Sequence, residues 1–91
     1  MAVTFSLPTV LAKLADGQST LHATGGTLGD VVAQIADRFP RLAPRLRDAG
    51  GGPYPFVTFY LNDEDIRFRQ GFATPVTEGD EITVVAAIAG G

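Results

Sequence analysis

Apolar and polar side chains alternate at the start of the chain. In residues 2–8 every second side chain is apolar, namely Val3, Phe5 and Leu7. A period of two is typical of a half-buried β-strand. Residues 19–24 can supply a second strand with Leu21 and Ala23 inward, after a turn at Asp16-Gly17. The pattern predicts an N-terminal hairpin.

The strongest periodic signal lies in residues 27–40. Thr27 stands where an N-cap is expected, with Asp30 three residues later. The apolar side chains then recur at the spacing of one helical face: Leu28, Val31, Val32, Ile35, Ala36 and Phe39. Pro40 ends the pattern. It predicts an amphipathic helix, followed by a short helical turn that carries Leu42 and Leu46.

The second half of the chain predicts three more strands. Residues 56–62 place Val57, Phe59 and Leu61 on one face, and residues 66–68 (IRF) form a short strand after a polar turn. In the last strand, Ile82, Val84, Ala86 and Ile88 share a face. The other face of this strand is also apolar, which favours a central position beside the first strand.

One amphipathic helix and a sheet with one apolar face can cover each other. The order strand, strand, helix, strand, short strand, strand therefore predicts an α+β fold of β-grasp (ubiquitin-like) topology, a mixed sheet of four to five strands packed on one helix. The predicted domain spans residues 1–88, and residues 89–91 are expected to form a flexible C-terminal Gly-Gly tail.

Size and charge limit the classes of protein that fit. The 91 residues suffice for one domain, and no apolar run approaches the ~18 residues that span a bilayer. The N-terminus lacks the pattern of a signal peptide, so we expect a cytoplasmic protein without a membrane partner. A net charge of −3 argues against nucleic-acid binding. The arginines Arg38, Arg41, Arg45 and Arg47 fit a solvated helix end, although an acidic partner surface stays possible there.

No residue set indicates an enzyme. The chain has no cysteine, and His22 is its only histidine. The contiguous acids in residues 63–65 lack the spacing of a calcium loop, and the glycines of GGTLGD at residues 25–30 lack that of a phosphate loop. A strand-to-helix turn explains Gly25 and Gly26. We therefore expect no bound cofactor and no metal.

The chain ends in AIAGG, and this end is the candidate site. A C-terminal carboxylate can attack the α-phosphate of ATP when another protein aligns the two groups. Glycines suit this use because they are thin enough for a narrow channel. This interpretation makes Gly91, preceded by Gly90, the reacting residue.

Five segments together resemble the ubiquitin-like sulfur carrier family of the MoaD/ThiS type, and most of all its CysO branch: GTLGDVV, FYLNDEDIRF, GFATPV, EGDEITVV and AIAGG. The resemblance implies that an activating enzyme of the ubiquitin-activating type adenylates Gly91 with ATP and magnesium. A sulfur donor then forms a thiocarboxylate. The carrier would deliver this sulfur to a PLP-dependent cysteine synthase, and a zinc-dependent peptidase would release the product.

The remaining predictions concern partners. The sheet face away from the core would carry Tyr60 and Val85, joined by Phe72 and by Ala89 of the tail, as a partner-binding surface. Three alternatives stay open: the small subunit of molybdopterin synthase, a ubiquitin-like protein modifier, and a plain interaction module. Ala86 and Ala87, where MoaD-type carriers often have prolines, weigh against the first. The tail lacks the basic residue common in ubiquitin-type modifiers.

Overall fold

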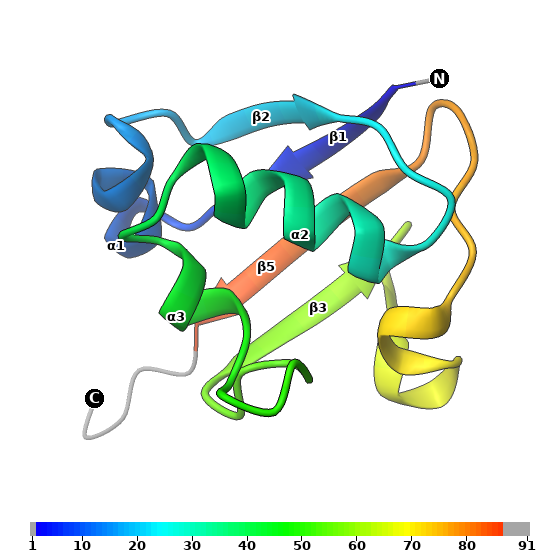
Figure 1. Ribbon diagram of the computed structural model, residues 1–91. Helices are drawn as coiled ribbons and strands as arrows, with labels where there is room; N and C mark the ends of the chain where they lie inside the picture. The colour runs from blue at the N-terminus through cyan, green and yellow to red at the C-terminus, as the bar shows by residue number, and fades with distance from the viewer. Residues whose placement is uncertain (1, 87–91) are drawn as a thin grey trace.

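Within residues 2–86, five strands form one mixed sheet in the order β2-β1-β5-β3-β4 (Figure 1). The computed structural model describes residues 2–86. The strands are β1 (Val3–Ser6), β2 (Thr20–Ala23), β3 (Val57–Leu61), β4 (Glu64–Asp65) and β5 (Glu81–Ala86). β5 runs parallel to β1 and antiparallel to β3, and β1 and β2 form the predicted hairpin. The predicted mixed sheet with a central last strand is confirmed.

Helix α2 (Leu28–Arg38) crosses one face of this sheet (Figure 1). Its start is fixed by the predicted pair, because the Asp30 backbone N–H donates to the Thr27 hydroxyl at 3.1 Å and the Thr27 backbone N–H donates to the Asp30 carboxylate at 3.2 Å. This capping box satisfies two donors that a helix start otherwise leaves unpaired. The helix ends before Pro40, as the sequence predicts.

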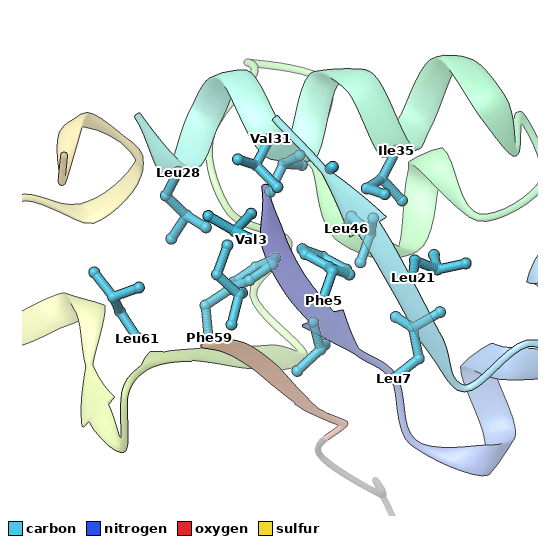
Figure 2. Close-up of a cluster of buried hydrophobic side chains, with 14 of the residues drawn as sticks. Val3, Phe5, Leu7, Leu21, Leu28, Val31, Ile35, Leu46, Phe59 and Leu61 are labelled. Carbon is cyan, nitrogen blue, oxygen red and sulfur yellow. The ribbon is translucent and has the colours of Figure 1, made fainter. Parts of the chain in front are cut away.

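The core lies between α2 and the sheet. Figure 2 shows Val3 and Phe5 of β1 beneath Val31 and Ile35 of α2, with Phe59 of β3 beside them. Phe5, Val31 and Ile35 are fully buried. Burying each such side chain contributes about 1.5–3 kcal/mol, so contacts of this kind hold the two layers together.

Two short helices close one end of the sheet. Helix α1 (Thr9–Ala12), which was not predicted, continues into a 3-10 helix at Lys13–Ala15. Helix α3 (Ala43–Leu46) is the predicted helical turn, and its Leu46 is fully buried. In Figure 1, α1 and α3 lie at the end of the sheet toward which β5 points.

The predicted strand at residues 66–68 is wrong. These residues form a 3-10 helix, and the pairing with β3 is confined to β4. The Asp65 carboxylate accepts a hydrogen bond of 2.9 Å from the Arg67 backbone N–H, a side-chain cap that starts a helical turn. The polar side chain of Asp65 therefore overrides the apolar alternation of the next three residues.

The two glycines before α2 differ in the space that a side chain would have at each position. A Cβ at Gly25 would lie 2.9 Å from the Asp30 Cβ and 3.1 Å from a methyl group of Val31, whereas at Gly26 the nearest contact would be an ordinary 3.6 Å. Gly25 thus allows the chain to pass closely over the first turn of the helix. The structural explanation predicted for the glycines holds at Gly25.

We predict that Gly25→Ala lowers the free energy of unfolding by about 1–3 kcal/mol, because the added methyl group overpacks the start of α2. Gly26→Ala is the matched control and changes it by less than about 1 kcal/mol. Urea denaturation of both variants measures the difference. Equal stability of the two variants would contradict this account of Gly25.

Candidate functional site

The predicted reactive end, Gly90 and Gly91 with Ala89 before them, lies outside the described residues, as does the predicted domain boundary at residue 88. The structure does describe the strand that leads to this end. The geometry of the candidate site is therefore the geometry of β5, and in particular of its last described residue, Ala86.

β5 is hydrogen-bonded on both sides. Along one side its register pairs Thr4 with Glu81 and continues to Ser6, and along the other it pairs Val57 with Ala86. The side chains of Ile82 and Val84 are buried against the core. Both neighbours pair with the first half of β5, and β3 alone continues to Ala86, so this pairing and the buried face fix the position of Ala86. Five further residues can reach at most about 18 Å from there, because each adds no more than about 3.6 Å.

The turn before β5 is held by an Asp80–Asn62 network. The Asp80 carboxylate accepts hydrogen bonds from the Thr77 backbone N–H at 2.8 Å and from the Asn62 side-chain amide at 2.9 Å. The Asn62 side-chain oxygen in turn accepts from the Glu81 backbone N–H at 2.9 Å. The hydrogen bond from Thr77, followed by that from Asn62, lowers the pKa of Asp80. The ionised carboxylate thus sets where β5 begins.

We predict that Asp80→Asn destabilises the protein near neutral pH by about 1 kcal/mol, because the amide replaces a charged acceptor. The lowered pKa means that ionised Asp80 adds stability above its ordinary pKa of 3.8 and loses it as the pH falls through the lower folded-state value. The variant and the unchanged protein should therefore converge in strong acid.

Thermal unfolding across the acid range measures this dependence. Glu78→Gln is the matched control, since Glu78 is an exposed carboxylate two positions away. If Asp80→Asn and Glu78→Gln gave the same pH profile, the Asp80 network would have no role in positioning β5.

Tyr60 and Val85 lie on the sheet face away from α2. The register pairs Thr58 with Val85 and Tyr60 with Thr83, which places these four side chains on neighbouring positions of one face. Val85 is 47% exposed, and the other three are half-buried. The structure therefore brings together Tyr60 and Val85, two of the residues predicted for partner binding.

The predicted position of Phe72 on that face is wrong. Its ring packs edge-to-face against Phe59, a buried core residue, with centroids 5.3 Å apart. Gly29 of α2 permits this approach, since a Cβ there would lie 3.1 Å from the Phe72 carbonyl oxygen. Phe72 covers the edge of the core on the helix side, because the 3-10 helix Gly71–Ala73 packs near the start of α2.

The contacts of the other polar candidates belong to the fold and do not form a second site within residues 2–86. Asp65 pairs with Arg67, whose side-chain hydrogen bonds are the main cause of the lowered pKa of Asp65. His22 is exposed on β2, and its carbonyl oxygen accepts a hydrogen bond from Arg38. Within residues 2–86, no three His, Cys, Asp or Glu side chains are grouped to hold a metal ion. None of the helices in that range is long and apolar enough to cross a membrane.

Comparison with known proteins identifies the class. Residues 6–91 match the ThiS family, and the chain belongs to this family of small ubiquitin-like proteins. It is 41% identical to the sulfur carrier protein CysO of Mycobacterium tuberculosis over 93 residues, with both chains covered completely. The resemblance predicted from the sequence is confirmed, and the chain is a homologue of sulfur carriers rather than of enzymes.

Solved structures agree with this assignment. The crystal structure of M. tuberculosis CysO superposes with a TM-score of 0.86 at 39% identity, covering 94% of this chain and 99% of the other. The CysO chain in the Amycolatopsis orientalis BexX/CysO complex gives a TM-score of 0.89 at 34% identity, covering 98% and 99%. That complex shows a relative bound to a partner protein. The predicted β-grasp fold is confirmed.

Proposed function

We propose that this protein carries sulfur as a thiocarboxylate on Gly91 and donates it in biosynthesis. The observation that supports this most strongly is the full-length identity to a sulfur carrier, in a chain that ends in Gly-Gly. The chain contains no cysteine, so the sulfur would come from a donor and be held on the main-chain carbonyl.

Two steps load the carrier. A carboxylate oxygen of Gly91 attacks the α-phosphorus of ATP, and pyrophosphate leaves to give an acyl adenylate. The sulfur of a sulfide donor then attacks the acyl carbon, and AMP leaves with the electron pair of the broken C–O bond. ATP and magnesium belong to an activating enzyme, since this chain offers only the nucleophile and its placement.

The proposed destination of the sulfur is cysteine. Resemblance to the CysO branch supports a PLP-dependent cysteine synthase as acceptor and a zinc-dependent peptidase for release. The same resemblance ranks this destination above molybdopterin synthesis and above modification of protein lysines. Tyr60 and Val85, with Ala89 beyond the described residues, form the proposed contact face for these partners. An exposed valine beside a half-buried tyrosine suits a transient contact.

We predict that deleting Gly91 abolishes pyrophosphate release by the cognate activating enzyme, because the carboxylate is withdrawn by one residue from the α-phosphate. The melting temperature should hardly change, since a terminal glycine contributes almost no apolar surface. A variant with one alanine added after Gly91 retains every native residue and should also be inactive. Pyrophosphate release at the native rate from either variant would overturn the assignment of Gly91.

A further inference from the structure

A groove of about 630 Å³ opens beside the end of β5. It lies where α1, α3 and the start of β3 meet, at the end of the sheet toward which β5 points (Figure 1). Ala86, the last described residue of β5, is part of its wall. Other lining residues include Val10, Lys13, Arg41, Arg45, Tyr54 and Phe56.

Two residues that line the groove expose apolar surface. Val10 is 54% exposed and Phe56 is 53% exposed, and both line this one hollow. The Phe56 ring is held edge-to-face by Tyr54, with centroids 5.4 Å apart. Single exposed apolar residues are ordinary, but apolar side chains gathered around a hollow mark a binding surface. A ring fixed by a neighbour loses little conformational entropy on binding.

The rim of the groove is basic. The charged residues among its described lining are Lys13, Arg41 and Arg45, in a chain with 7 basic and 10 acidic residues. The ion pairs within residues 2–86 join Arg67 to Asp65 and Arg69 to Glu64, so none involves the rim. The positive charge of the rim is therefore available to an acidic partner, although the net charge of the whole chain is −3.

We propose that this groove is a docking site for a segment of the activating enzyme that carries apolar side chains flanked by carboxylates. The proposal rests on the proposed function and names the surface that the enzyme uses. An enzyme that holds Gly91 in its active site is tethered within about 18 Å of Ala86, and Ala86 borders the groove. The basic rim would speed association, and Phe56 would anchor the bound segment.

Calorimetric titration of the full-length protein with its purified cognate activating enzyme, without ATP, tests this site. Phe56→Ser should weaken binding by about tenfold or more, whereas Phe68→Ser should change it by less than about twofold. Phe68 is the matched control because it is 81% exposed and does not line the groove. Thermal unfolding verifies that each variant is folded.

A second matched pair tests the charge. Arg45→Glu should weaken binding and reduce its dependence on salt, because it reverses one rim charge. Arg47→Glu makes the same change two positions away, outside the groove lining, and should have little effect.

Equal effects within both pairs, or unchanged binding for Phe56→Ser and Arg45→Glu, would overturn the docking proposal. If those variants bound and released pyrophosphate as the unchanged protein does, the groove assignment would fail while the sulfur-carrier function stood. If the unchanged protein bound the enzyme through the groove without releasing pyrophosphate, the proposed activation of Gly91 would fail instead.

Discussion

The pairing of β5 on both of its sides is the constraint on which the rest of the structure depends. The strand is parallel to β1 and antiparallel to β3, and the packing of α2 buries Ile82 and Val84. Removing such a strand would expose the core and leave two neighbouring strands with unpaired backbone groups. The last described strand is therefore held both by backbone pairing and by core packing. A proposed reactive end needs this kind of anchor, because a partner must align it with a phosphate.

Polar side chains at the start of β5 complete this arrangement. Asp80 and Asn62 fix the residue at which β5 begins, and the register with β3 carries that position to Ala86. Beyond Ala86 the proposed chemistry requires a segment long enough to enter the partner's active site and a free carboxylate at its end. It does not require particular side chains. In the proposed cycle, the described residues provide contact surfaces for partners and hold the strand that leads to Gly91. The catalytic groups of that cycle belong to other proteins. The groove and the Tyr60–Val85 face are two such surfaces on either side of β5's end.

Local signals predicted most of the fold. The Thr27–Asp30 capping box and the apolar face of α2 were readable because both depend on residues three or four positions apart. Alternation and the apolar character of both faces placed β5 in the centre of the sheet. The prediction failed where a single residue decided the local structure. Asp65 caps a 3-10 helix where the apolar alternation indicated a strand. Gly29, which has no side chain, leaves space for Phe72 to pack against the core. The groove could not be predicted, because it joins Val10 of α1, Arg45 of α3 and Phe56 of the turn before β3, which are far apart in the sequence.

In the proposed cycle, the chain end accepts sulfur after activation. Intact-mass spectrometry of the full-length protein, incubated with ATP, a sulfide source and its cognate activating enzyme, tests it directly. We expect a species heavier by the difference between one sulfur atom and one oxygen atom, absent when ATP is omitted. An unchanged mass, or conjugates to lysine residues of other proteins without any sulfur-bearing carrier, would contradict it.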